Sequence, residues 1–432
     1  MSATLALALV IQLASVVVVV LATKPSRLRY IGLLFIVMAF IYHGVTEVYQ
    51  LVFGPNHLYR AFVDQEPIDS WALLVSTGML CFAVVYALSL SRTSPPTHVP
   101  KAPADWRFVL ALVVPLFLGA LYSTVVLNAG IEAEVNQGAD TWLPTLASQF
   151  LLLLTVLLSY CFIVKSQEPR VGWIVAAQSL VLILLGERLQ VLAGIVVLLY
   201  ALARVGVRIK PRIIAIGLVL SFVTFLAISS ARLVVGRERF GGSPGERIQI
   251  LVDSITSIQP DERLTEDFAH RFDGNTFAAL VKMRLADGWA PLGMRGIAIN
   301  LGLTIPQVLN PTKLESSVAD RDEEAAAISQ LRLPLRDYLP TLFGTVFSYG
   351  GAWLIAPFGA LLGFLVARLD SFLQKRDNVL VLLVCMGASY CVFFYERTSA
   401  IYYSTARAIL ILLVLLKVGG WLRARNSLDH AS

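Results

Sequence analysis

Basic side chains gather in the polar stretch 232–339, which separates two long apolar parts of the chain. They form clusters at Arg232, Arg237 and Arg239, at Arg263, His270 and Arg271, at Lys282 and Arg284, and at Arg295. A guanidinium group binds phosphate oxygens through parallel hydrogen bonds and stays protonated. An arginine-rich pocket in this stretch therefore suits a pyrophosphate ligand. The alternative is that these arginines are solvated or contact lipid headgroups.

His270 is the only histidine of this stretch, and it stands beside Arg271 and close to Asp273. Imidazole titrates near neutral pH, and a neighbouring carboxylate can prepare it to accept a proton. His270 is therefore a candidate general base. A surface histidine without a catalytic role is the alternative.

Other ionisable residues interrupt apolar runs, where a charge is costly and marks a candidate site. Gly186, Glu187 and Arg188 separate two short apolar runs, which form either one broken helix or a tight hairpin. This break has no obvious packing purpose, so we interpret it as functional. His43 and Glu47 lie one helical turn apart, and that spacing favours a structural pair.

Near the last apolar run, Glu396, Tyr403 and Arg407 are spaced by seven and four residues and would share one helix face, with Arg397 beside them. That face should point into the protein. Arg407 is either a functional group or one half of a buried ion pair with Glu396 or Glu47 that fixes helix packing.

Several other kinds of site are missing from the sequence. It has no phosphate-binding glycine loop, no HExxH zinc motif and no nucleophile-elbow serine. The four cysteines all fall inside apolar runs without a paired motif. We therefore expect no metal site and no cofactor.

The elements that position these residues are apolar. Hydrophobic residues make up 57% of the chain and charged residues only 15%, whereas soluble domains carry about a quarter charged residues. A soluble enzyme is excluded by this composition. The basic residues lie mostly between apolar runs and form no nucleic-acid-binding module, so we expect no nucleic acid partner.

The sequence predicts an all-α polytopic integral membrane protein with about 11 transmembrane helices and one large, partly helical extracytoplasmic loop. The expected spans lie near 4–22, 30–51, 70–90, 107–128, 145–164, 171–186, 188–203, 213–231, 340–367, 378–395 and 400–418. They divide the chain into N-terminal transmembrane helices (1–231), the large loop (232–339) and C-terminal transmembrane helices (340–432). Apolar positions at helical spacing, such as Phe277 and Leu280, predict that the loop is folded.

Alternating loop charges predict the orientation of these spans. Short loops that follow the first, third and later odd-numbered spans are basic, whereas the intervening short loops are acidic or nearly uncharged. Because cytoplasmic loops hold the excess of lysine and arginine, the N-terminus should lie outside and the C-terminus in the cytoplasm. The large loop then lies on the outer face.

The segment from Gly293 to Leu314 resembles a stretch of the bacterial oligosaccharide repeat-unit polymerases, the Wzy-like O-antigen polymerases. In that family a pattern close to Ile-Pro-Arg, apolar, Trp-Pro-x-Lys-Pro is common. The matching residues are Ile305, Pro306, Pro311 and Lys313, whereas Gln307 replaces the usual arginine and Leu314 the usual proline. Pro340, Thr341, Gly344, Tyr349, Gly350, Gly351, Gly359 and Gly363 resemble the family's return into the membrane, and Gly186 to Arg188 its glycine-arginine break.

This resemblance implies a glycosyltransferase on the outer face of the bacterial cytoplasmic (inner) membrane. Its partners would be undecaprenyl-diphosphate-linked donor and acceptor glycans and the lipid bilayer, together with a chain-length regulator and a flippase. The diphosphates would be bound by Arg188, Arg271, Arg284, Arg295, Arg397 and Arg407. The catalytic base would be Glu187, His270 or Asp273.

Two other functions remain open at this point. An O-antigen ligase shares the spans, the outer loop and the lipid-diphosphate donor, and it passes the glycan to lipid A core. A transporter or flippase of the lipid-linked unit would need charges along a path through several spans and symmetric halves, whereas the ionisable residues here gather at the outer ends.

Overall fold

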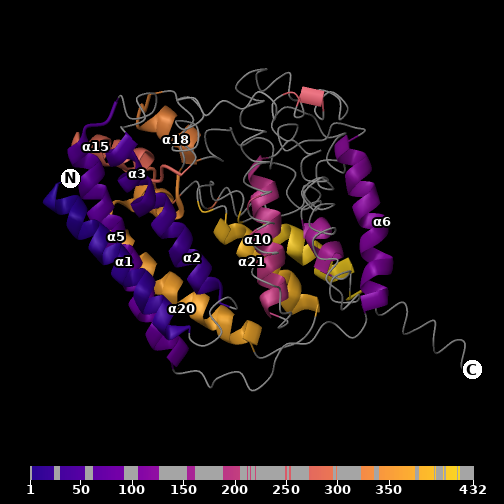
Figure 1. Ribbon diagram of the computed structural model, residues 1–432. Coiled ribbons are helices and arrows are strands. Elements are labelled where there is room, and N and C mark those ends of the chain that lie inside the picture. The colour runs from indigo at the N-terminus through magenta and orange to yellow at the C-terminus, as the bar shows by residue number, and fades with distance from the viewer. Residues whose placement is uncertain are drawn as a thin grey trace, which may run out of the picture. The chain divides into compact units, whose positions relative to one another are not determined.

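The computed structural model describes part of the 432-residue chain. The described segments are 2–23, 30–53, 62–91, 106–125, 153–160, 188–204, 272–294, 323–334, 340–374, 379–393 and 405–415, with a few isolated positions. Within these segments the regular secondary structure is helical (Figure 1). The expected helical class is confirmed for this part of the chain.

The chain forms two compact units that interleave along the sequence. Unit 1 comprises 1–98, 265–375 and 391–404, and unit 2 comprises 99–264, 376–390 and 405–432. Unit 1 therefore contains the first three expected spans, part of the large loop and the ninth expected span. The division into 1–231, 232–339 and 340–432 stays a prediction about membrane placement.

Among the described residues, four helices are long and apolar enough to cross a membrane: Ala3–Ala22, Ile31–Val52, Gln65–Leu90 and Ala352–Gln374. Shorter apolar helices cover Ala193–Ala203, Val381–Phe393 and Thr405–Leu415. Unit 2 also contains α6 (Trp106–Val125), α10 (Arg188–Arg204) and most of α21 (Val379–Phe393). The expected spans near 171–186 and 213–231 lie almost wholly outside the described residues, so the count of about 11 stays a prediction.

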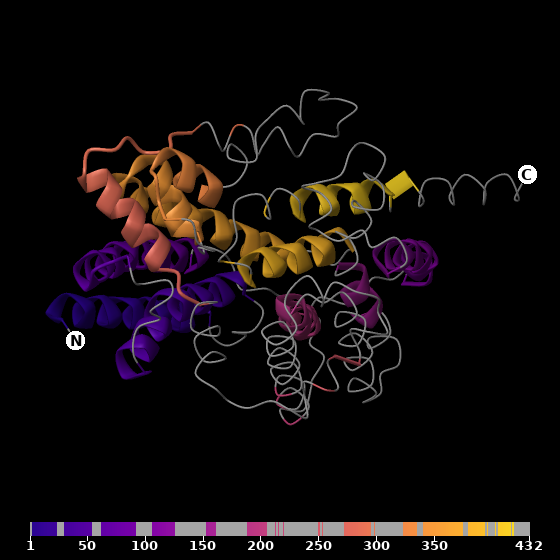
Figure 2. The ribbon, with the colours of Figure 1, turned by 90° about the horizontal axis from the view of Figure 1, so that it is seen from above.

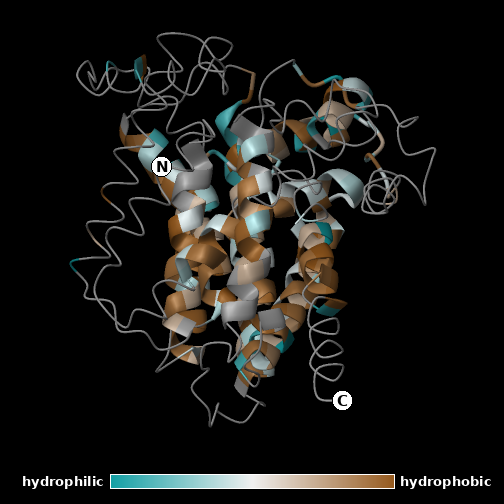
Figure 3. Cartoon of the chain, turned by 90° about the vertical axis from the view of Figure 1, so that its right-hand side faces the viewer, coloured by the Kyte–Doolittle hydropathy of each residue, from teal (hydrophilic) through white to brown (hydrophobic). Residues whose placement is uncertain are grey.

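Helix α1 (Ala3–Ala22) buries polar side chains together with apolar ones on one side and exposes aliphatic side chains on the other. Its buried residues recur every three or four positions: Leu5, Ala8, Gln12, Ser15 and Val19. Its exposed large residues are all aliphatic: Leu7, Val10, Leu13, Val17 and Leu21. The hydrophobic colour also covers much of the helices in Figure 3. This arrangement suits a helix whose outer side contacts lipid, because lipid tails need no polar cover.

The long helices of unit 1 alternate in direction. Gln12 of α1 donates a hydrogen bond to Ser76 of α5 (Gln65–Ser91) at 3.0 Å, and Ser2 bonds to Asp69 near the start of α5, so α1 and α5 are parallel. Helix α2 (Ile31–Phe40) runs the other way and continues through η2 (Ile41–Val45) into α3 (Thr46–Phe53). These relative directions agree with the expected alternation, while the side that faces outward stays a prediction.

Helix α20 (Ile355–Gln374) lies directly against the backbone of α5. A Cβ atom at Gly359 would meet the Gly78 carbonyl oxygen at 2.2 Å, and one at Gly363 would meet the Phe82 carbonyl oxygen at 2.5 Å. Small residues four positions apart allow such close approach in membranes, where van der Waals packing and hydrogen bonds must hold helices together. Only glycine fits at these two positions.

Asp370 joins three helices at the other end of this contact. Its carboxylate, which is fully buried, accepts hydrogen bonds from the backbone N–H groups of Ile31 (2.8 Å) and Gly32 (3.0 Å). It also accepts one from the Tyr86 hydroxyl of α5, at 2.7 Å. A carboxylate at a helix N-terminus satisfies donors that have no partner within the helix. Asp370 of α20 therefore ties α2 and α5 together.

The ninth expected span, near 340–367, is not one continuous helix. Helix α19 (Leu342–Gly350) ends at Gly351, whose φ of 83° favours glycine, and η5 (Ala352–Leu354) leads into α20. Phe343 lies against Gly78, and Phe347 packs on Trp71 with ring centroids 5.1 Å apart, so α19 runs opposite to α5. The chain therefore forms a helical hairpin before α20 crosses.

We expect Gly359→Ala to lower the stability of the protein by about 1 to 3 kcal/mol, because the new methyl group overlaps the α5 backbone. Gly119→Ala in α6 is the matched control, since nothing lies within 4 Å of a Cβ there. Thermal unfolding in detergent measures both. Equal midpoints for the two variants would contradict the importance of the close crossing.

We also expect Asp370→Asn to destabilise the protein by about 1.5 to 3 kcal/mol, because a charged acceptor for three donors is lost. Tyr86→Phe should cost less, since it removes one donor and leaves the carboxylate with its backbone partners. Thr77→Ala, which removes an exposed hydroxyl bonded to Leu73, is the control. Unfolding midpoints that fall in any other order would argue against this role for Asp370.

Candidate functional site

Two ionisable side chains, His43 and Glu47, are fully buried within the candidate span Ile31–Val52. His43 lies in η2, a single π-helical turn, which widens the helix at that point. The Thr46 hydroxyl, just after this turn, is close to the carbonyl oxygens of Ile41 (2.9 Å) and Phe272 (2.6 Å). Such π turns are frequent at functional sites, and buried ionisable groups at membrane depth are costly. This part of unit 1 is therefore the first candidate site.

Asn275 connects His43 to Glu47. Its side-chain N–H groups donate to the His43 carbonyl oxygen (3.1 Å) and to Glu47 Oε1 (2.7 Å). Its Oδ1 atom lies 2.7 Å from His43 Nδ1, and the other ring nitrogen, Nε2, lies 3.1 Å from the Tyr395 hydroxyl. The expected structural pair of His43 and Glu47 is thus bridged by an asparagine from the large loop.

These contacts determine the roles of the imidazole nitrogens. An amide oxygen can only accept, so His43 Nδ1 carries the proton and donates it to Asn275. Nε2 of the neutral ring then accepts from the Tyr395 hydroxyl. Each of these hydrogen bonds therefore joins a donor to an acceptor, as a buried polar network requires.

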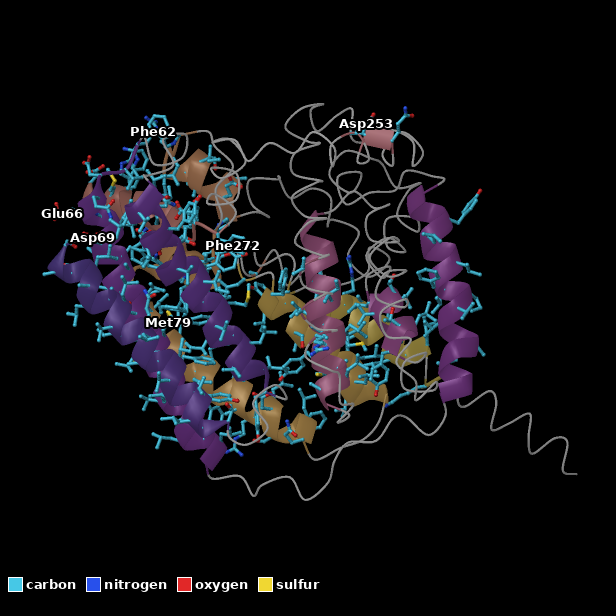
Figure 4. All side chains as sticks on the ribbon, viewed as in Figure 1. Phe62, Glu66, Asp69, Met79, Asp253 and Phe272 are labelled. Atoms are coloured by element: carbon cyan, nitrogen blue, oxygen red, sulfur yellow. The ribbon has the colours of Figure 1, made fainter. Side chains whose placement is uncertain are left out.

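Asp273 caps the loop helix α15 (Thr276–Ala286). Its Oδ1 accepts from the backbone N–H groups of Asn275 (3.0 Å) and Thr276 (3.2 Å), and its Oδ2 from the Thr276 hydroxyl (2.6 Å) and Gln50 Nε2 (3.2 Å). Phe272, just before it, is labelled in Figure 4. These donors occupy the lone pairs that a catalytic base needs. The geometry thus favours a capping role for Asp273.

The N-termini of two short helices meet at this network. Thr341 caps α19 by accepting from Gly344 N–H at 3.1 Å, and a Cβ at Gly274 would meet Thr341 Cγ2 at 2.6 Å and His43 Cε1 at 3.1 Å. Gly274 N–H donates to the Tyr42 carbonyl oxygen at 3.1 Å. Helix N-termini carry partial positive charge, which favours nearby carboxylates such as Glu47 and Asp273.

Cationic side chains line the far end of α15, which lies beside α5 in both views (Figures 1 and 2). Arg284 donates to the Arg332 carbonyl oxygen at 3.1 Å. Lys282 bonds to Ser70, and burial lowers the pKa of its ammonium group, against the opposing effect of Glu66. Glu66 and Asp69 mark the adjacent start of α5 in Figure 4. Helix α15 therefore has the carboxylate of Asp273 at its start and the cationic groups of Lys282 and Arg284 near its end.

The structure places the residues that the sequence singled out in three ways. Asp273 is buried at the start of α15, whereas Arg284 is half-exposed in the last turn of that helix, so the two lie at opposite ends of it. Arg407 lies in unit 2, on the apolar helix Thr405–Leu415. Arg188 is the first residue of α10, and the structure does not describe its side chain. The others, Glu187, His270, Arg271, Arg295 and Arg397, lie outside the described residues.

Sequence reasoning missed Asn275, Gln50 and Tyr395. The run Asp273-Gly274-Asn275 before an apolar helical segment is a typical helix start, and it could have predicted the cap. It could not have predicted the bond from Asn275 to Glu47, which joins residues 228 positions apart.

Fold and site together define an α-helical membrane protein in which a loop segment closes a buried polar network between helices. Comparison of the chain with protein-family models, with curated proteins and with solved structures found no match.

We expect Asn275→Leu to destabilise the protein by about 1 to 3 kcal/mol, because His43 and Glu47 each lose a buried partner. Ser329→Ala, at an exposed hydroxyl that bonds to Ala326, is the control. Thermal unfolding gives the cost, and limited proteolysis reports whether α15 stays docked. An Asn275→Leu protein as stable and as protease-resistant as the control would show that the network neither stabilises the protein nor holds α15 in place.

Proposed function

We propose that the protein is a membrane glycosyltransferase that polymerises undecaprenyl-diphosphate-linked oligosaccharide repeat units into a surface polysaccharide. The observation that supports this most is the docking of α15. A polar loop segment inserts its N-terminus beside His43 and Glu47 at membrane depth and keeps Arg284 at its other end. Such a unit, built partly from loop and partly from spans, suits a substrate that is itself part lipid and part sugar.

The proposed reaction exchanges one bond for another. The bond from the anomeric carbon of the growing glycan to its diphosphate breaks, and the same carbon bonds to a hydroxyl of the incoming lipid-linked repeat unit. The hydroxyl proton passes to a base, and undecaprenyl diphosphate leaves with the bonding electrons. Preorganised cations that face the leaving diphosphate lower the barrier, because charge develops there.

The residue roles are part of this proposal. Arg188, Arg271, Arg284, Arg295, Arg397 and Arg407 bind the diphosphates of donor and acceptor. Glu187 or His270 takes the proton, since Asp273 is occupied by its capping bonds. Arginines replace a divalent cation at the diphosphate, so no metal is needed.

The proposed setting is the outer face of the bacterial inner membrane, with the N-terminus outside and the C-terminus in the cytoplasm. Apolar helices and basic loops support this placement. A flippase that supplies the repeat unit and a chain-length regulator are the proposed partners.

The test is to incubate purified protein in nanodiscs with its matching undecaprenyl-diphosphate-linked repeat unit and no other acceptor. A ladder of lengthened glycans on a gel is the expected product. Folded protein without a ladder would overturn the polymerase. Product that forms only after lipid A core is added would identify a ligase, and movement of the unit between leaflets without new bonds would identify a flippase.

Arg188→Ala should abolish the ladder without loss of folded protein, because a diphosphate ligand is removed. Arg208→Ala, in a segment expected to be cytoplasmic, should leave the ladder unchanged. Gel densitometry on both variants, with size-exclusion chromatography to confirm folding, measures the difference. Equal ladders would remove Arg188 from the site.

A further inference from the structure

Arg284 and Arg332 come from separate segments and meet at the C-terminal end of α15. Arg284 Nη2 holds the Arg332 carbonyl oxygen at 3.1 Å, and the Arg332 guanidinium carbon lies 5.4 Å from the centroid of the Trp289 ring. The backbone N–H of Trp289 in turn donates to the backbone carbonyl oxygen of Arg284 at 3.1 Å. These contacts connect Arg284, Trp289 and Arg332, and they place the Arg332 guanidinium over the Trp289 ring.

The backbone of Arg332 is in a conformation that arginine rarely adopts. Its φ is 51°, and it is the only residue other than glycine with positive φ among those described. The neighbours Leu331 and Leu333 are buried, and their N–H groups bond to the Ala327 carbonyl oxygen at the end of α18 (Glu323–Gln330). A residue in this left-handed conformation commonly ends a helix, where glycine or asparagine is usual, and here arginine takes that place. The fold therefore presents the Arg332 side chain outward at some cost.

An apolar edge lies next to these cations. Leu292 N–H donates to the Ser348 carbonyl oxygen (2.8 Å) and Gly293 N–H to that of Tyr349 (3.2 Å), so the chain after Trp289 follows the end of α19. Just beyond these bonds, Met294 is 63% exposed and Trp353 is 72% exposed. Large exposed apolar side chains beside arginines fit the boundary between headgroups and acyl chains.

The depth of this edge agrees with that boundary. Helix α5 has 27 residues and is about 40 Å long, which exceeds a hydrocarbon core of about 30 Å. Phe347 packs on Trp71, in the second turn of α5, so the C-terminal end of α19 lies near the N-terminal end of α5. Met294 and Trp353 therefore lie near headgroup level, with the arginines close by.

We propose that Arg284, Arg332, Trp289, Met294 and Trp353, here named the Arg332 site, bind the diphosphate and first isoprene units of a polyprenyl diphosphate. This inference rests on the proposed function, and it assigns the lipid end of the substrate to unit 1. The two guanidinium groups bind the diphosphate oxygens, and Met294 and Trp353 contact the chain. Asp287, whose carboxylate is 3.7 Å from Arg284, forms an exposed ion pair that is weak enough for a diphosphate to displace.

The test measures binding of farnesyl diphosphate, a short polyprenyl diphosphate, to the full chain in phosphatidylcholine nanodiscs. The variant is Arg332→Gly, because glycine adopts a φ of 51° without strain, so the fold should be kept while the guanidinium is lost. We expect the dissociation constant to rise about tenfold or more. Thermal unfolding should stay unchanged or move upward.

The matched control is Arg368→Ala. Arg368 also lies over an aromatic ring, 5.0 Å from the centroid of Phe364, but in the C-terminal half of α20, whereas Trp353 precedes the start of that helix. It should bind farnesyl diphosphate like the parent protein. Equal binding by the Arg332→Gly and Arg368→Ala variants would overturn the proposal.

Further probes separate the lipid substrate from other sources of phosphate. Inorganic pyrophosphate should bind the parent protein more weakly than farnesyl diphosphate does. Farnesol, which lacks the diphosphate, should bind weakly to both the parent protein and the Arg332→Gly variant. If Arg332→Gly instead reduces only the affinity for phosphatidylglycerol nanodiscs, the site takes bulk anionic lipid and the proposal is wrong.

The glycan ladder distinguishes this site from the function on which it rests. A ladder together with unchanged farnesyl diphosphate binding by Arg332→Gly would overturn the site and keep the polymerase. Absence of a ladder with weakened binding would overturn the polymerase and keep a polyprenyl diphosphate site.

Discussion

Unit 1 depends on the direct approach of α20 to the backbone of α5 at Gly359 and Gly363. Lipid tails are as apolar as leucine, so helices in a membrane gain little from burying apolar surface against each other. Close packing and internal hydrogen bonds must hold them instead. Asp370 supplies such bonds at one end of the contact, where it ties the start of α2 to α5.

At the other end of this contact, the polar network joins the candidate span that contains His43 and Glu47 to the segment that leads into α15. Asn275 bonds to both His43 and Glu47, and Asp273, which accepts from backbone N–H groups at the start of α15, also binds Gln50 of α3. Polar bonds of this kind specify one arrangement, because a half-satisfied buried network costs more than an apolar one. They hold α15 in a fixed orientation, with Asp273 just before its start and Arg284 in its last turn.

The sequence predicted the first three helical spans of unit 1 well, because a helix that crosses lipid must be a long apolar run. It also marked His43, Glu47, Asp273 and Arg284 as residues of interest. The partners Asn275, Tyr395 and Asp370 were not predictable, since they depend on contacts across more than two hundred residues. The turn at Gly351 was hidden for another reason: two glycines inside an apolar run give no hydropathy signal, although they reverse the chain.

The sequence distance between Glu47 and Asn275 has a consequence for biogenesis. The residues are 228 positions apart, which at about 5 to 20 residues per second is some tens of seconds of translation. During that interval the second span is already synthesised, while its histidine and glutamate still lack the asparagine. A nascent chain in this state must keep water or a protein insertase around these groups. Ribosome stalling before Asn275 would therefore leave an insertion intermediate that membrane proteases can recognise.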